Sequence, residues 1–236
     1  MEGQFRSLID IFKTGKEQYP DKTAIIMGED TRTYGDIFDN AKKIAGFVLK
    51  KGIKPQDKVA VISQNHVDYI ETVLGILMTG AVPVNINWRL AAPELHHLLQ
   101  FNEVKLTFFR SKDESIRKEM GELTKEMCQC VDMDCIKEVL EGVEPLEQFI
   151  EREDEDVLMH LHTSGTTGMP KTVRYTKGQY MRELTTCVHS LGFDKDTVFQ
   201  LMSQLFHSAS IGPYSIFACG GTIVLFPKFS PQEYLK

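Results

Sequence analysis

One short segment concentrates side chains that bind phosphate. Residues 163–171 read TSGTTGMPK and hold four hydroxyl groups, two glycines and one lysine, with no acidic residue. Glycines let backbone N–H groups approach phosphate oxygens, hydroxyls add donors that rotate, and a lysine adds a point charge. The segment therefore predicts a phosphate-binding loop. Its candidate residues are Thr163, Ser164, Gly165, Thr166, Thr167, Gly168 and Lys171.

The segment does not fit the other common phosphate or nucleophile motifs. A Walker A loop has its lysine directly after the second glycine, at the start of a helix. Here Met169 and Pro170 intervene, and the following Thr172, Val173 and Tyr175 favour an extended strand. The GxGxxG and GxSxG fingerprints are also absent. A flexible surface turn is the plainer alternative, because Gly, Ser and Thr are ordinary loop residues.

Alternating strands and helices must position this loop. Apolar patterning predicts strands at 23–27, 31–33, 58–63, 81–85, 105–110, 157–161, 172–176, 197–202 and 221–226, and helices over 37–48, 67–77, from 93, and near 113–128, 178–190 and 207–219. Thr33 and Asp36 predict a capping box at the first of these helices. The alternation predicts an α/β fold with largely parallel sheets flanked by helices.

An acidic segment separates the two halves of the pattern. Nine acidic residues and a single base, Arg152, lie between Glu138 and Asp156. Such a run is typical of a solvated surface segment. We expect 1–150 to form a first α/β subdomain and 151–236 to hold the loop and the start of a second, with a boundary near 150–156.

Composition excludes several classes of protein. The 236 residues are 42% hydrophobic and 25% charged with a net charge of −6, which fits a globular protein and argues against a nucleic-acid partner. Neither a secretory signal nor a transmembrane segment is visible. The five cysteines lack the spacing of a disulfide framework, so we expect a cytoplasmic location. Cys128, Cys130 and Cys135 have no CxxC pair or nearby histidine, which argues against a metal site.

The last residues carry the start signal of a helix. Ser230, Pro231 and Glu233 have the types favoured at the N-cap, first and third helical positions, and the sequence ends at Lys236. So short a helix is marginal in water. We therefore expect the chain to be a fragment of a longer protein.

TSGTTGMPK resembles the phosphate-loop signature of the adenylate-forming (AMP-binding) superfamily, which includes acyl-CoA and aryl-CoA synthetases, peptide adenylation domains and luciferases. Further segments are similar to family elements in the family's order: TYGD (33–36), GIKPQDKVAVISQN (52–65), GILMTGAVPVNIN (75–87) and QLFH (204–207). Thr172 stands where the family usually has glycine, His162 where it has an aromatic residue and Gln204 where it has proline. The family's later motifs would lie beyond residue 236. The chain thus resembles the first half of the family's large N-terminal domain.

The resemblance implies an ATP-dependent ligase that activates a small-molecule carboxylic acid as an acyl adenylate and passes it to a thiol, expected to be coenzyme A. It implies that the loop residues named above hold the β- and γ-phosphates, and that Mg²⁺ is held by phosphates and by residues beyond the chain. The 236-residue chain alone is expected to be inactive. The identity of the acid, coenzyme A versus a carrier-protein thiol, and the oligomeric state are left open. The alternatives are a phosphate-loop protein that binds nucleotide without adenylation and a scaffold whose loop is only a turn.

Five residues near the motifs are considered separately. The resemblance places His207 near the acyl pocket and the α-phosphate, as a candidate catalytic residue; otherwise it is a structural histidine at the start of a buried helix. His160 and His162 flank a strand end and are predicted to be structural. Trp88 lies in a loop after a strand, as does its neighbour Arg89, and neither is assigned a role.

Overall fold

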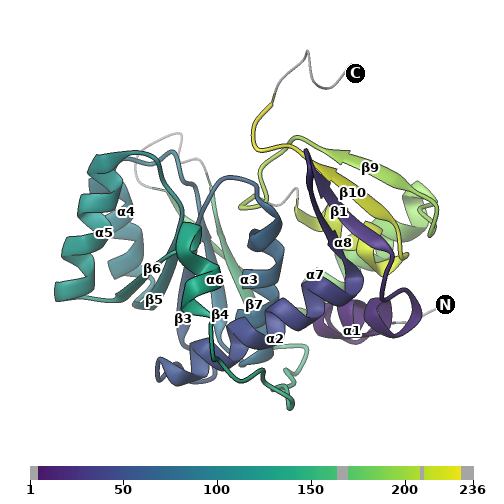
Figure 1. The fold of residues 1–236 in the computed structure, drawn as a ribbon, viewed down its shortest axis with the longest axis horizontal. Helices are drawn as coiled ribbons and strands as arrows, with labels where there is room; N and C mark the ends of the chain where they lie inside the picture. The colour runs from purple at the N-terminus through teal and green to yellow at the C-terminus, as the bar shows by residue number, and fades with distance from the viewer. Residues whose placement is uncertain (1–4, 164–169, 208–209, 230–236) are drawn as a thin grey trace.

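Two β-sheets lie side by side, with helices packed against them (Figure 1). The computed structural model describes residues 5–163, 170–207 and 210–229, so the predicted helix start at Ser230 lies outside it. The elements are α1 (Leu8–Gln18), β1 (Thr23–Met27), β2 (Asp30–Thr33), α2 (Tyr34–Lys50), β3 (Lys58–Ile62), α3 (Val67–Met78), β4 (Val82–Ile86), α4 (Ala92–Phe101), β5 (Val104–Phe109), α5 (Glu114–Glu126), β6 (Gln129–Asp132), α6 (Ile136–Val139), β7 (Val157–His162), β8 (Thr172–Thr176), α7 (Lys177–Leu191), β9 (Val198–Leu201), α8 (Ile211–Ala218) and β10 (Thr222–Leu225). No helix in these ranges is long and apolar enough to cross a bilayer.

The larger sheet has six strands in the order β6-β5-β3-β4-β7-β8. All neighbours pair in parallel except β8, which runs antiparallel to β7. The central strands β3 and β4 are almost entirely buried, as are all residues of α3. Such burial on both faces explains why these strands are continuous apolar runs. The predicted α/β fold with mostly parallel sheets is confirmed.

The smaller sheet joins distant parts of the chain. Its order is β2-β1-β10-β9, and β1 pairs in parallel with β10 through Ile25 and Ile223. β2 is antiparallel to β1, as expected for a hairpin. Each sheet takes strands from both sides of residues 150–156. The boundary expected there therefore does not coincide with the division between the sheets.

Local signals explain how the helices begin and approach one another. The capping box of α2 is confirmed: Thr33 Oγ1 accepts from Asp36 N at 3.0 Å, and the Asp36 carboxylate accepts from Thr33 N at 2.9 Å. Gly75 lets α3 pack closely on α2, because a Cβ there would lie 2.8 Å from Ile44. This packing buries the apolar face of α2 and fixes α3 beside β3 and β4.

Candidate functional site

The predicted phosphate loop leaves the end of β7 and returns into β8. Its two ends are joined by hydrogen bonds: Thr163 N donates to Lys171 O at 3.0 Å, and Lys171 N donates to Thr163 Oγ1 at 3.3 Å. Both end residues are exposed. These two hydrogen bonds close the base of the loop, and we call the pair Thr163 and Lys171 its neck. The candidates between them, Ser164, Gly165, Thr166, Thr167 and Gly168, lie outside the described residues.

Asn102, at the C-terminal end of α4, connects the strands on both sides of this neck. Its Oδ1 accepts from His160 Nδ1 at 2.9 Å and from Thr172 Oγ1 at 3.4 Å. Its Nδ2 donates to Leu98 O at 2.8 Å and lies 3.4 Å from His162 Nε2. The side chain is 5% exposed, so these groups have little access to water. One buried amide therefore ties α4, β7 and β8 together beneath the loop.

The hydrogen bonds fix the protonation of both histidines. Asn102 Oδ1 can only accept, so Nδ1 of His160 carries the proton. His162 Nδ1 faces Asn85 O at 3.0 Å and must donate, which leaves its Nε2 to accept from Asn102. Burial, assisted by the charge of Arg174, lowers the pKa of His160 to about 4. Burial also lowers the pKa of His162, and both rings are neutral at pH 7. The predicted structural role of these histidines fits this arrangement.

Two hollows lie near these elements, one between α4 and β8 and the other at the carboxyl ends of the parallel strands. One, of about 620 Å³, adjoins the loop and is lined by Phe101, Lys171 and Arg174 among others. The other, of about 710 Å³, lies beyond β4 and β5 and includes Arg89 and Arg110 in its lining. In open parallel sheets, ligands bind outside the carboxyl ends of the strands. This edge of the sheet is therefore the candidate site, and its cationic side chains suit an anionic ligand.

The segment that carries His207 crosses from the smaller sheet to the larger one. Trp88 Nε1, after β4, donates to Gln204 Oε1 at 2.9 Å, and Gln204 Nε2 donates to Pro227 O at 3.1 Å. A proline, which is usual at this position in the family that the sequence resembles, has no side-chain amide and could make neither bond. Trp88, which received no role from the sequence, is thus one of the contacts that hold this segment. His207 itself is exposed, and its ring packs on Phe206 with centroids 4.5 Å apart.

Asn65, after β3, holds the same segment from the other side. Its Nδ2 donates to Ser203 O at 2.8 Å and to Phe226 O at 2.9 Å, and its Oδ1 accepts from Leu205 N at 2.8 Å. The residue is 1% exposed. His207 and the phosphate loop are therefore both attached to the carboxyl edge of the six-stranded sheet. His207 is exposed, but its neighbours remove part of its water; this partial desolvation, followed by the charge of Arg89, lowers the pKa of the ring, which is neutral at pH 7.

An ion-pair network connects the hairpin of the smaller sheet to this edge. Arg32 of β2 contacts Glu71 at 2.8 Å and Asp68 at 3.4 Å, both on α3. Arg110, after β5, contacts the other oxygen of Asp68 at 2.8 Å. Burial alone would raise the pKa of Asp68, but His66 and Arg110 outweigh it and lower that pKa to about 2. The carboxylate stays ionised at neutral pH and holds β2 against the larger sheet.

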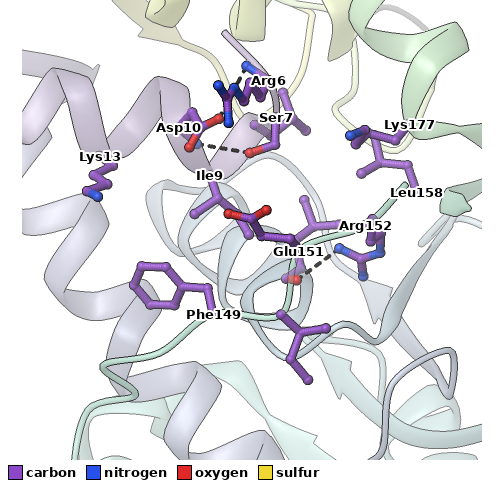
Figure 2. A pocket seen from close by; sticks show the side chains of 13 residues that line it. Arg6, Ser7, Ile9, Asp10, Lys13, Phe149, Glu151, Arg152, Leu158 and Lys177 are labelled. Atoms are coloured by element: carbon purple, nitrogen blue, oxygen red, sulfur yellow. Dashed lines mark hydrogen bonds between the residues drawn. The ribbon is translucent and has the colours of Figure 1, made fainter. Parts of the chain in front are cut away.

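A further cavity, of about 470 Å³, lies at the opposite ends of the strands (Figure 2). Arg152 lines it and donates to Leu77 O at 2.9 Å and to Ala81 O, just before β4. Eight of the nine acidic residues of the 138–156 run are exposed, as predicted, but Arg152 is buried. The only base of that run thus has a structural role at the end of α3. Because this cavity faces the amino ends of the parallel strands, it is not the candidate site.

Comparison with known proteins shows which family the chain belongs to. The sequence matches the AMP-binding enzyme family over residues 12–236. The chain belongs to this family. It is 26% identical to a medium/long-chain-fatty-acid–CoA/3-oxocholest-4-en-26-oate–CoA ligase of Mycolicibacterium smegmatis, with 96% of this chain and 46% of that protein covered. It is also 26% identical to a feruloyl-CoA synthase of Amycolatopsis sp., with 92% of this chain and 43% of that protein covered.

Solved structures of other proteins share the fold. The o-succinylbenzoate CoA synthetase of Bacillus subtilis, in complex with its acyl-adenylate intermediate, superposes with a TM-score of 0.84 at 23% identity, over 96% of this chain and 58% of that one. A long-chain-fatty-acid–CoA ligase of Archaeoglobus fulgidus gives 0.85 at 24% identity, over 97% and 48%. This AMP-binding family member thus spans about half the length of its relatives.

Proposed function

We propose that this AMP-binding family protein is the N-terminal part of an ATP-dependent ligase that activates a small carboxylic acid and transfers it to a thiol. The family match over residues 12–236 carries the proposal. The closed neck of the loop at the carboxyl edge of the sheet supports it. Relatives named as CoA ligases favour coenzyme A as the thiol. None of the five cysteines is in a disulfide, which fits the cytoplasmic location that we infer.

The proposed reaction has two steps. A carboxylate oxygen attacks the α-phosphorus of ATP, a new P–O bond forms, and the bond to the bridging oxygen breaks so that pyrophosphate leaves. The thiol sulfur then attacks the acyl carbon, the thioester forms, and AMP leaves while the thiol loses its proton. Chemistry of this kind depends on positioning and on neutralising charge more than on covalent help from the protein.

We infer that the loop residues bind the β- and γ-phosphates. The Thr163 hydroxyl and the Lys171 ammonium group can both donate hydrogen bonds to anionic oxygens. In the part of the chain that the structure describes, no three His, Cys, Asp or Glu side chains gather to hold a metal ion. Mg²⁺ would accordingly be held by phosphate oxygens and would neutralise their charge. The residues proposed for the phosphates are Thr163, Ser164, Gly165, Thr166, Thr167, Gly168 and Lys171.

We infer that His207 acts at the acyl pocket as a neutral hydrogen-bonding group. Its lowered pKa argues against a role as a charge clamp on phosphate. Replacing it, in His207→Ala, removes one hydrogen bond to the reacting groups. A loss of about 1.4 kcal/mol would reduce the rate of adenylation about tenfold.

The test is carboxylate-dependent exchange of labelled pyrophosphate into ATP, measured on the full-length gene product. Lys171→Ala is expected to reduce exchange about 10²–10³-fold, the cost of removing one strong charge-stabilising donor. Lys43→Ala, on an exposed position of α2, is the matched control and should leave exchange unchanged. ATP binding without exchange for any carboxylic acid would favour the nucleotide-binding alternative. Absence of both would refute the assignment.

A further inference from the structure

Cys128 and Cys130 bring two sulfur atoms together at the edge of the six-stranded sheet. Cys128 follows α5, and Cys130 lies on the edge strand β6. Their Sγ atoms are 3.9 Å apart, and neither sulfur is in a disulfide. No third metal-ligating side chain joins them among the described residues. The pair therefore calls for an explanation other than metal binding.

The surroundings of the two sulfurs differ. Cys128 is 4% exposed and packs in the small core beneath α4 and α5, with its sulfur 3.5 Å from Thr107 Oγ1. Cys130 is only partly buried, so a solute can reach it. The hydrogen bond with Cys130 lowers the pKa of Cys128 to about 7, against the effect of burial and with help from Thr107 and His96. Because the thiolate is the reactive form, Cys128 is a competent nucleophile at neutral pH.

We propose that Cys128 and Cys130 form a vicinal dithiol that oxidises reversibly to an intramolecular disulfide. Residues two apart in an extended chain have Cα atoms about 6.5 Å apart, within the range of about 4.4–6.8 Å that a disulfide bridges. The sulfurs need to close from 3.9 Å to about 2.05 Å. The two Cβ atoms must also come within about 3.5–4.5 Å of each other. Cys128 lies before β6, whose pairing with β5 begins at Gln129, so the chain on that side can supply the movement.

The oxidant named here is a small disulfide such as glutathione disulfide. The accessible Cys130 thiol gives up its proton and attacks one of its sulfurs, a mixed disulfide forms, and one glutathione leaves. The Cys128 thiolate then attacks the Cys130 sulfur and releases the second glutathione. One S–S bond is broken and one is formed, two electrons pass from the protein to the reagent, and the two thiol protons end on the released glutathione.

The experiment counts thiols in the full chain after equilibration with glutathione disulfide at pH 7.5. The protein is acid-quenched, denatured and alkylated with N-ethylmaleimide, and its mass gives the number of labels. The parent, with five cysteines, is expected to fall from five labels to three and to return to five after dithiothreitol. Cys135→Ser, which removes an exposed neighbour, is the matched control and should fall from four to two.

The pair variants decide the proposal. Cys130→Ser should keep four labels, whereas Cys128→Ser should keep three and carry one glutathione on Cys130, because no second thiol is there to release it. Phenylarsine oxide, which bridges two thiols, should bind the parent and Cys135→Ser but neither pair variant. Circular dichroism checks folding, and the partly buried Cys130→Ser keeps the test valid if Cys128→Ser does not fold. A loss of two labels in Cys130→Ser, a covalent dimer, or a stable glutathione adduct on Cys130 of the parent would overturn the proposal.

Discussion

Replacing Asn102 with leucine tests whether one buried amide holds the base of the phosphate loop. Leucine has a similar volume but no polar atoms, so it fills the space and removes every hydrogen bond of the side chain. The buried Nδ1–H of His160 then has no acceptor at the position that Asn102 Oδ1 now occupies. Leu98 O and Thr172 Oγ1 also lose their bonds to the amide.

The size of the effect follows from these contacts. A buried donor left without a partner costs about 1–3 kcal/mol, and the lost bond to Leu98 O contributes about 0.5–1.5 kcal/mol. The longer contact to Thr172, at 3.4 Å, adds little. We expect the free energy of unfolding to fall by about 2–4 kcal/mol. With a denaturant slope of about 3 kcal/mol per molar urea, the unfolding midpoint falls by about 1 M.

The assay is urea unfolding of the parent and the variant, followed by circular dichroism. Gln100→Ala, at an exposed position two residues earlier on α4, is the matched control and should stay within about 0.5 kcal/mol of the parent. An Asn102→Leu variant as stable as this control would show that the histidines do not depend on the amide, and the connection between α4, β7 and β8 would have to be abandoned.

Three further changes have definite expected outcomes. The pKa of His160 is about 4 in the folded chain and 6.5 in the unfolded chain. The neutral His160 ring therefore contributes its full stabilisation above pH 6.5. As the pH falls from 6.5 to 4, the free energy of unfolding decreases by about 3 kcal/mol. In urea unfolding, the free energy of unfolding should fall less between pH 7 and pH 5 for His160→Asn than for the parent. An equal fall in the two proteins would contradict this prediction. Gly75→Ala places a methyl group 2.8 Å from Ile44 of α2 and should cost about 1–3 kcal/mol in thermal unfolding, whereas Gly121→Ala, with open space around it, should not destabilise. Thr33→Ala should cost about 1 kcal/mol through loss of the α2 cap, and Thr33→Ser should restore it.

The elements that the sequence predicts well are those with strong local signals. The α2 cap and the buried strands β3 and β4 follow from side chains a few residues apart. The short α6 and the four-residue β6 were missed because neither is long enough to show a period. β6 is recognisable only through its pairing with β5.

The contacts that build the site are non-local, and the sequence could not supply them. Asn102 meets His160 from 58 positions away, and Trp88 meets Gln204 from 116. The two histidines in the otherwise apolar strand β7 could have indicated that a buried polar side chain lies beside them. They could not have indicated that this side chain is Asn102. The acidic residues around Arg152 made the whole run read as exposed surface, so its burial was not predicted. Only the fold shows that its guanidinium group reaches the backbone at the end of α3.

The parallel pairing of β1 with β10 has a consequence for synthesis on the ribosome. The partners Ile25 and Ile223 are 198 positions apart. At about 5–20 residues per second, the first strand waits about 10–40 s for its neighbour to be made. During that interval one backbone edge of the nascent hairpin is unpaired, whereas β3 can pair with β4 and β5 as soon as residue 109 has been made. Chaperones that hold nascent chains should therefore bind the hairpin of β1 and β2 more strongly than the segment that forms β3 and β5.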